Sequence, residues 1–180
     1  MKTRIILLAI VVCNFLSSCK GDKTDEAVAE VAPKNQFKIT LNAIVKKDDN
    51  FQLFFNETTF DKPFKEENAI WVEVKGNEAA QDIVFTLPED RIPNYLRLDI
   101  GTNDKQEVMT INSMKIEYLK KQHNLKGGVI FDNFTIADCI EIKEKNTGTL
   151  ITKKNKSGIY DPILYSGEIL KPEFQNLIKQ

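Results

Sequence analysis

The stretch Phe37-Lys38-Ile39-Thr40-Leu41-Asn42-Ala43-Ile44-Val45 alternates apolar and polar side chains. Apolar residues occupy every odd position, and the even positions 38, 40 and 42 are polar. Successive side chains of a β-strand point to opposite faces, so a period of two indicates a strand with one buried face. This stretch therefore predicts a strand on the inner side of a β-structure, and the chain that follows repeats the pattern.

Further segments of this kind are separated by turn residues throughout the chain. We expect strands at residues 51–56, 70–75, 83–87, 95–100 and 108–119, in the apolar segment after Gly127-Gly128, and on both sides of the turn Lys145-Asn146-Thr147-Gly148. About eight or nine short strands without βαβ units are typical of a sandwich of two sheets. The sequence predicts an all-β, jelly-roll-like antiparallel β-sandwich over residues 37–180.

Three local features refine this prediction. The inward-facing set changes parity near Asn112-Ser113, which predicts a β-bulge within residues 108–119. Gly148 is expected in the left-handed conformation of a hairpin turn. Only Pro172–Gln180 has the apolar spacing of a helix, so a short C-terminal helix is expected.

The N-terminus has the order of segments found in export signals. Lys2 and Arg4 precede the apolar run 5–16, which is too short for a membrane span of about 20 residues. The following Leu16-Ser17-Ser18-Cys19 resembles the cleavage and lipidation box of bacterial lipoproteins. The resemblance implies a signal peptide at residues 1–18, diacylglycerol on the Cys19 sulfur and an acylated Cys19 amine. Several acyl chains together hold a protein stably on a membrane.

Residues 19–36 are expected to be the lipidated cysteine and a flexible tether, because Lys20–Gln36 contains no aromatic residue. A lysine followed by acids after the lipidated cysteine resembles the surface-export signal of Bacteroidetes lipoproteins, although Gly21 here separates Lys20 from Asp22. The expected location is the outer membrane, and the sequence leaves the periplasmic and surface leaflets both open.

Charge and cysteine content narrow the function classes. Removal of residues 1–18 takes away two basic residues and no acid, so the formal net charge changes from −1 to −3. Nucleic acid is therefore not an expected partner. Cys139 is the one cysteine left after cleavage and lipidation, and its apolar neighbours predict a core residue and no disulfide within the mature chain.

A second resemblance concerns the body of the chain. The runs Ile70-Trp71-Val72-Glu73-Val74-Lys75-Gly76, Asp82-Ile83-Val84-Phe85-Thr86-Leu87-Pro88 and Tyr95-Leu96-Arg97-Leu98-Asp99-Ile100-Gly101 resemble the galactose-binding-like jelly-roll domains of bacterial envelope proteins. The resemblance spans residues 37–120. It implies a jelly-roll fold and suggests carbohydrate binding.

Strand parity then selects candidate ligand-binding residues. If Phe51, Leu53 and Phe55 face the core, one outward face carries Phe54, Trp71, Tyr95, Arg97 and Asp99. Aromatic rings stack on the C–H faces of sugars, and a guanidinium and a carboxylate bond sugar hydroxyls. In the alternative interpretation, loops or the C-terminal helix cover this face and its aromatic residues form a second core.

Other chemistries have weaker support. The segment Asp99-Ile100-Gly101-Thr102-Asn103-Asp104 contains oxygen-bearing residues of the kind that bind Ca²⁺, but turns are commonly rich in these residues and no metal or cofactor is expected. His123, the single histidine, is expected in a solvated polar connection. No nucleophile-elbow, zinc-protease or phosphate-loop motif occurs, so catalysis is not expected, and a carboxylate-based hydrolase is the third candidate.

These features together predict a lipid-anchored binding module of the cell envelope whose ligand is carbohydrate or another envelope component. The expected partners are the membrane, through lipid on Cys19, and a glycan or envelope protein. The alternative is a structural or interaction lipoprotein of an outer-membrane complex that has no small-molecule site.

Overall fold

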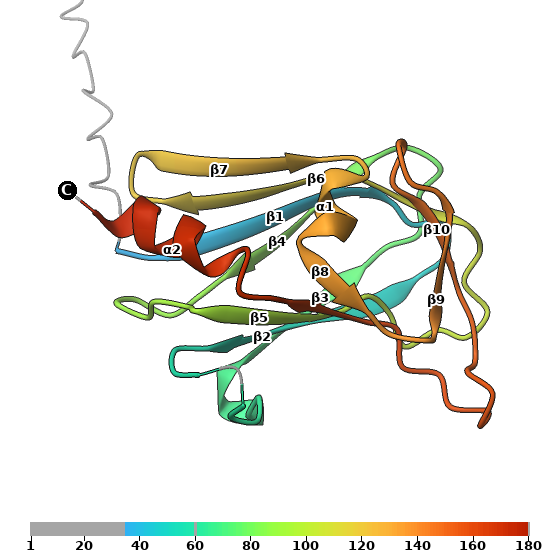
Figure 1. The fold of residues 1–180 in the computed structure, drawn as a ribbon. Coiled ribbons are helices and arrows are strands. Elements are labelled where there is room, and N and C mark those ends of the chain that lie inside the picture. The colour runs from blue at the N-terminus through green and yellow to red at the C-terminus, as the bar shows by residue number, and fades with distance from the viewer. Residues whose placement is uncertain (1–34, 60, 180) are drawn as a thin grey trace, which may run out of the picture. The chain divides into compact units, whose positions relative to one another are not determined.

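Two antiparallel sheets bury the alternating apolar residues between them (Figure 1). The computed structural model describes residues 35–59 and 61–179. Its elements are β1 (Phe37–Ile44), β2 (Asp49–Asn56), η1 (Glu66–Asn68), β3 (Ala69–Val74), β4 (Gln81–Thr86), β5 (Tyr95–Asp99), β6 (Met109–Tyr118), β7 (Lys121–Lys126), α1 (Val129–Asp132), β8 (Phe134–Ile136), β9 (Ile140–Glu144), β10 (Thr149–Thr152), β11 (Ile163–Ser166) and α2 (Lys171–Ile178). The expected all-β antiparallel sandwich with a short C-terminal helix is confirmed.

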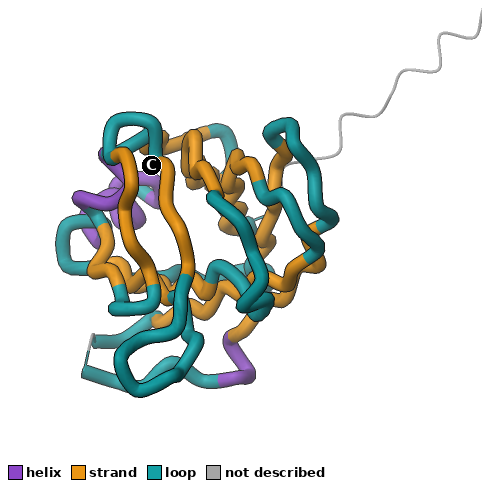
Figure 2. Tube along the Cα trace, turned by 90° about the vertical axis from the view of Figure 1, so that its right-hand side faces the viewer, coloured by secondary structure: helices purple, strands orange, loops and turns teal. Residues whose placement is uncertain are grey.

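The chain passes repeatedly from one sheet to the other. The first sheet, sheet A, has the order β4-β1-β6-β10-β9, and β7 also pairs with β6. The second, sheet B, has the order β3-β2-β5-β11-β8. Strands β1, β4 and β6 lie in sheet A, and β2, β3 and β5 lie in sheet B, so the first six strands are divided between the sheets in a jelly-roll-like manner. Figure 2 shows the arrangement from the side.

The predicted division of strand residues into inward-facing and outward-facing sets is confirmed in the core. Sheet A contributes the odd positions of β1 and both inward sets of β6, and sheet B contributes the odd positions of β2 and the even positions of β5. The expected bulge is also present: Asn42 pairs with Ser113 and Ala43 pairs with Ile111, which leaves Asn112 as the extra residue. Gly148 has φ 77°, as the hairpin turn requires.

Two expectations about residues 121–132 are wrong. His123 lies on β7, not in a connection, and its Nδ1 is 3.1 Å from the Glu173 carboxylate of α2. The polar sequence of β7 lacks the alternation that predicts a strand. Such a sequence is tolerated because β7 is an edge strand, paired only with β6 among the described strands. The apolar residues after Gly128 form the single helical turn α1, where a strand was expected.

The two helices complete the core beside the edge strands β7 and β8. Ile130 and Phe131 of α1 and Phe174 and Leu177 of α2 are buried among the core residues. Figure 1 shows α2 at the end of the sandwich where β1 begins and where β6 turns into β7.

The predicted signal peptide (residues 1–18), the lipidation at Cys19 and most of the tether (19–36) lie outside the described residues. Cys139 is buried, as expected, and its Sγ accepts the Asp161 backbone N–H at 3.3 Å. In the part of the chain that the structure describes, no helix is both long and apolar enough to cross a membrane.

Candidate functional site

The outward residues selected by parity lie on one face of sheet B. Trp71 pairs with Gln52, which pairs with Asp99, so these three form one cross-strand row. Phe54 and Arg97 pair directly in the next row. Residues directly opposite in an antiparallel sheet point to the same face. Tyr95 lies two residues before Arg97 on β5 and therefore shares this face.

These residues do not form the open binding platform that parity suggests. Phe54 is only 3% exposed, because the Phe64 ring contacts it edge-on at a centroid distance of 6.4 Å. Tyr95 is 1% exposed, and its hydroxyl contacts Glu168 and Lys171 near the start of α2. The alternative interpretation, that loops and the C-terminal helix cover this face, is therefore correct for both residues.

Arg97 and Asp99 are engaged with each other and with the covered rings. The Arg97 Nε and Nη2 atoms donate to Asp99 at 2.8 and 2.7 Å, and the guanidinium carbon is 4.8 Å from the Phe54 ring centroid. Burial raises the pKa of the Asp99 carboxyl, and the Arg97 guanidinium opposes that change. This geometry stabilises a small aromatic cluster outside sheet B and leaves Trp71, which is 57% exposed, as the accessible aromatic ring of the predicted set.

The connection between β2 and β3, residues 57–68, forms the cover over Phe54. Asn56 anchors its start: the Asn56 Oδ1 accepts from the Thr58 backbone N–H and hydroxyl at 2.8 Å each, and its Nδ2 donates to the Thr59 and Lys62 carbonyls at 3.2 and 3.1 Å. Near the other end, Gln52 donates to Glu66 of η1 at 3.4 Å. Figure 1 shows η1 outside sheet B.

This connection and the segment that precedes β5 line a solvent-open cavity of about 360 Å³. Most of its lining residues have polar or charged side chains of both signs, among them Glu57, Thr58, Lys62, Glu67, Asn68 and Arg91, although more of the exposed lining surface is apolar than polar. Small-molecule sites have volumes of about 300–1,000 Å³ and use a few fixed polar groups for recognition. The cavity is therefore large enough for one end of a small polar ligand.

Arg91 and Glu57 are fixed at the cavity wall. The Arg91 Nε donates to Glu57 at 2.8 Å, and its Nη2 donates to the Asn68 side chain at 3.0 Å. Glu57 also accepts the Ile92 backbone N–H at 3.0 Å. The Arg91 Nη1 has no acceptor among the described residues, so this donor remains for a ligand.

The same contacts determine the protonation of Glu57. The hydrogen bonds from Arg91 hold the pKa of the Glu57 carboxyl below its usual value, against the opposing effect of burial. The general acid of a glycosidase needs the opposite shift, a raised pKa. Glu57 is therefore an acceptor for ligand hydroxyls and unsuited to donate a catalytic proton near neutral pH.

Glu57, Asn68 and Arg91 were not among the residues selected from the sequence. The usable signal was the length of the connection. Residues 57–68 join two paired strands, whereas hairpin loops commonly have 2–5 residues, and unusually long loops are often functional. Alternation within strands carries no information about such a loop.

The oxygen-rich segment 99–104 surrounds the carboxylate of Asp49 and does not form a Ca²⁺ loop. Asp49 Oδ1 accepts the backbone N–H groups of Thr102 and Asn103 at 2.7 and 3.1 Å, and its Oδ2 accepts from Gln106 at 3.0 Å. Gly101 has φ 135°, and a Cβ there would lie 2.7 Å from Asp49 Oδ2. The backbone therefore directs N–H donors, not oxygen ligands, into the loop.

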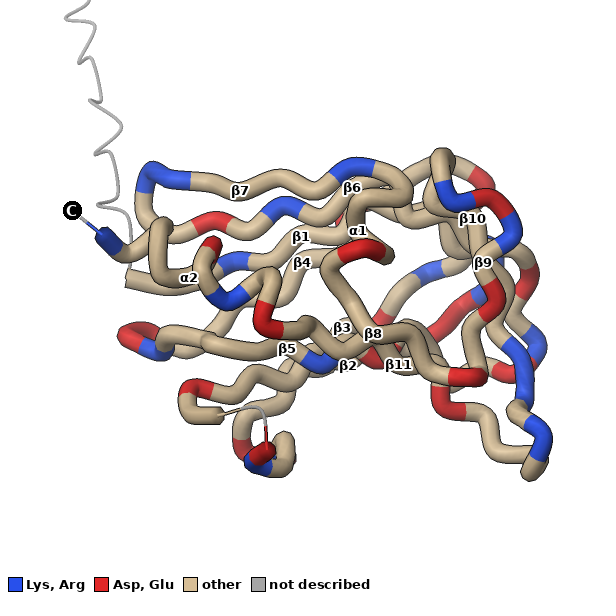
Figure 3. Tube along the Cα trace, in the orientation of Figure 1, with Lys and Arg blue, Asp and Glu red and all other residues tan. Residues whose placement is uncertain are grey.

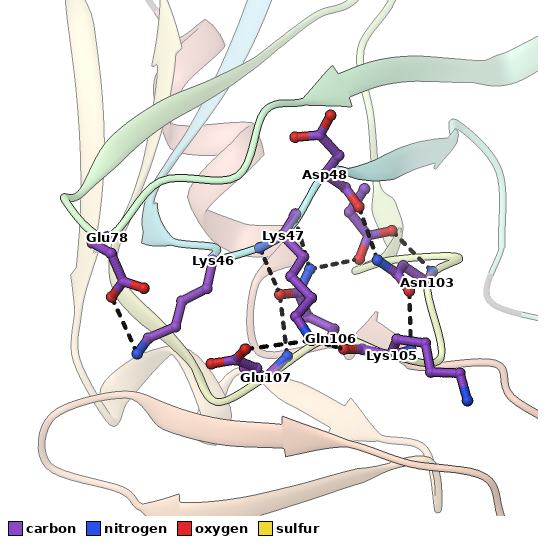
Figure 4. A network of polar contacts seen from close by, with 9 residues as sticks. Lys46, Lys47, Asp48, Glu78, Asn103, Lys105, Gln106 and Glu107 are labelled. Atoms are coloured by element: carbon purple, nitrogen blue, oxygen red, sulfur yellow. Dashed lines mark hydrogen bonds and ion pairs between the residues drawn. The ribbon is translucent and has the colours of Figure 1, made fainter.

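Neighbouring contacts complete this network (Figure 4). Gln106 exchanges two hydrogen bonds with the Lys47 backbone, each 3.0 Å, and Asn103 donates to the Asp48 carbonyl at 3.0 Å. Asp104, the last residue of the oxygen-rich segment, forms an ion pair with Lys154 at 2.9 Å. Among the described residues, no group of three or more His, Cys, Asp or Glu side chains is placed to hold a metal ion.

We predict that Asp49→Ala lowers the free energy of unfolding by about 1–3 kcal/mol, because it removes the charged acceptor of the partly buried Thr102 and Asn103 backbone N–H groups. Asp48→Ala is the matched control, since the Asp48 side chain is exposed and should affect stability far less. Urea denaturation measures both variants. Equal midpoints for the two variants, or a melting temperature raised by Ca²⁺, would contradict this account of the loop.

We also predict that Glu57→Gln lowers the free energy of unfolding by about 0.5–1 kcal/mol at pH 7, the range for a partly exposed ion pair. Because the folded-state pKa of Glu57 is lowered, its contribution is complete above the unfolded value of about 4.3 and is lost as the pH falls through the folded value. The deficit should therefore shrink below about pH 4. Denaturation between pH 2.5 and 7 tests this, with Glu144→Gln as the control without an ion pair. A deficit that is constant with pH would contradict it.

Comparison of the chain with protein-family models, curated proteins and solved structures finds no match. The resemblances to bacterial lipoproteins and to galactose-binding-like domains therefore remain predictions that rest on the residues quoted above. On this face of sheet B, the cavity and the exposed Trp71 are the features suited to recognition of a ligand.

Proposed function

We propose that this protein is a lipid-anchored binding module of the bacterial outer membrane and that its cavity beneath residues 57–68 binds carbohydrate. The N-terminal sequence supports the anchor: a cationic start, an apolar run, and Leu16-Ser17-Ser18-Cys19. The observation that carries the ligand class is the Glu57–Arg91–Asn68 cluster, which holds acceptors and donors in fixed positions at the wall of a cavity whose remaining surface is largely apolar.

The cavity suits a neutral, hydroxyl-rich ligand. Sugar hydroxyls both donate and accept hydrogen bonds, so they match a wall on which carboxylate, amide, hydroxyl and guanidinium groups alternate. Glu57 and Glu67 nearly balance the charges of Lys62, Lys65 and Arg91, which gives no strong preference for an anion or a cation. Because hydrogen bonds within the chain already orient Glu57 and Arg91, ligand binding requires little additional ordering of these side chains.

Trp71 extends this site. It follows the cavity-lining Asn68 by three residues, so their Cα atoms are at most about 11 Å apart. Its side chain points to the face of sheet B on which the cover lies, and an exposed indole offers a flat surface to a sugar ring. A glycan whose end occupies the cavity can therefore stack a further ring on Trp71.

We expect the purified protein to bind glycans on an array and Arg91→Lys to weaken that binding at least about tenfold. Lysine keeps the charge and loses the planar donor set, and the loss of a well-placed hydrogen bond to a charged group costs about 1.5–3 kcal/mol. Trp71→Ala should weaken binding to longer glycans more than to short ones. Val84→Ala, at an exposed position of β4 in sheet A, is the control that should bind normally. An array without binding, or equal binding by Arg91→Lys, contradicts the proposal.

A second candidate function is protein docking within an outer-membrane complex, and the position of β3 favours it. Strand β3 lies at the edge of sheet B, so one side of it is not paired with another described strand, and Trp71 is exposed beside that edge. Unpaired edges accept a strand from another chain. An array without binding, together with co-purification of an envelope protein that Trp71→Ala releases, would favour this function.

A further inference from the structure

An apolar groove with a basic border lies at the end of the sandwich where β1 begins. The groove has a volume of about 290 Å³ and lies between the β6–β7 turn and the end of α2. Leu119, Leu177 and Ile178 supply apolar lining, and Lys120, Lys121 and Lys179 surround it. Figure 3 shows basic residues at the β6–β7 turn and at the end of α2.

Leu119 is held in an unfavourable conformation with its side chain exposed. It has φ 53°, in the left-handed region that glycine and asparagine normally occupy in hairpin turns, and it is 46% exposed. A glycine would fit this turn with less strain and less apolar surface in water. The local physics of the hairpin therefore does not explain a leucine here, whereas an apolar contact outside the chain does.

The three lysines are available for an external anion. Within residues 35–59 and 61–179, none of them forms an ion pair; Lys121 donates to the Lys179 carbonyl, and Lys179 donates to the Asn176 side chain. Lysines elsewhere are commonly neutralised, as in the pairs of Lys38 with Glu117 and Lys145 with Asp132. The groove therefore combines apolar side chains with lysines that pair with no described acid, the composition of a surface that rests on an anionic bilayer.

The first strand, β1, begins at this same end of the sandwich. Phe37, the first residue of β1, pairs with Tyr118 and stacks on its ring at 4.6 Å, and Tyr118 lines the groove. Only residues 20–34 separate the predicted lipid on Cys19 from the first described residue, Asn35, and fifteen residues span at most about 50 Å. The predicted anchor therefore keeps this end of the sandwich within about 50 Å of the membrane.

We propose that this groove is a membrane-docking surface: Leu119 enters the interface of an anionic bilayer while Lys120, Lys121 and Lys179 contact its phosphate headgroups. The inference rests on the proposed lipid anchor and adds an orientation to it. The end with the β6–β7 turn faces the membrane, and the loop between β10 and β11, at the opposite end in Figure 1, faces away.

Single-tryptophan reporters test this orientation, because Trp71 is the one tryptophan of the chain. Leu119→Trp and Ile159→Trp are each combined with Trp71→Phe in the lipidated protein and reconstituted into phosphatidylglycerol–phosphatidylethanolamine vesicles with brominated acyl chains. Ile159 is the matched control, since it is 57% exposed in the loop between β10 and β11. We expect a blue shift and quenching for the tryptophan at position 119 and neither for that at position 159.

Adding Lys120→Gln and Lys121→Gln to the Leu119→Trp protein should lower the ratio of docked to undocked molecules about 25-fold, because each lysine near an anionic surface contributes about a factor of five. A protein that floats with the vesicles but shows equal quenching at positions 119 and 159 overturns the docking surface and leaves the anchor intact. A protein that does not float overturns both. A tryptophan at position 119 that is shielded from aqueous quenchers before vesicles are added shows that another part of the chain or a second copy fills the groove, and this also overturns the proposal.

Discussion

Strand β2 is buried on both of its faces, and much of the structure around the candidate site follows from this constraint. All six residues from Phe51 to Asn56 are buried, although only the three odd-numbered ones point into the core. The outward Gln52, Phe54 and Asn56 must therefore be covered by a segment outside the sheet. The cover removes the Phe54 ring from water, and it must supply hydrogen-bond partners to the Gln52 and Asn56 amides.

The long connection 57–68 meets these requirements and creates the cavity as a consequence. Its backbone carbonyls accept from Asn56, Glu66 accepts from Gln52, and Phe64 contacts Phe54. The same connection is bonded to the segment before β5 through Glu57 and Asn68, and the space left beside these contacts is the cavity, bounded by the Glu57–Arg91 pair. The proposed ligand site is thus a product of how the fold covers the outer face of β2.

The features that the sequence predicts are local, and those that it does not predict depend on contacts between distant segments. Alternation within a strand is local, so the inner faces, the bulge at Asn112, the left-handed Gly148 and the C-terminal helix were all predictable. Contacts between distant segments are not encoded by any local period. The burial of Phe54 and Tyr95, the Asp49 carboxylate that binds the backbone of residues 102 and 103, and the pairing of Glu57 with Arg91 each depend on such contacts.

The most direct test of this account is a double-mutant cycle between Phe54 and Phe64, measured as free energies of unfolding. The account predicts that Phe54→Ala and Phe64→Ala are each destabilising and that their effects are coupled by about 0.5–1.5 kcal/mol, the range for an aromatic pair. Strictly additive effects of the two substitutions would show that residues 57–68 do not close over β2, and the cavity and the site proposed within it would then be lost.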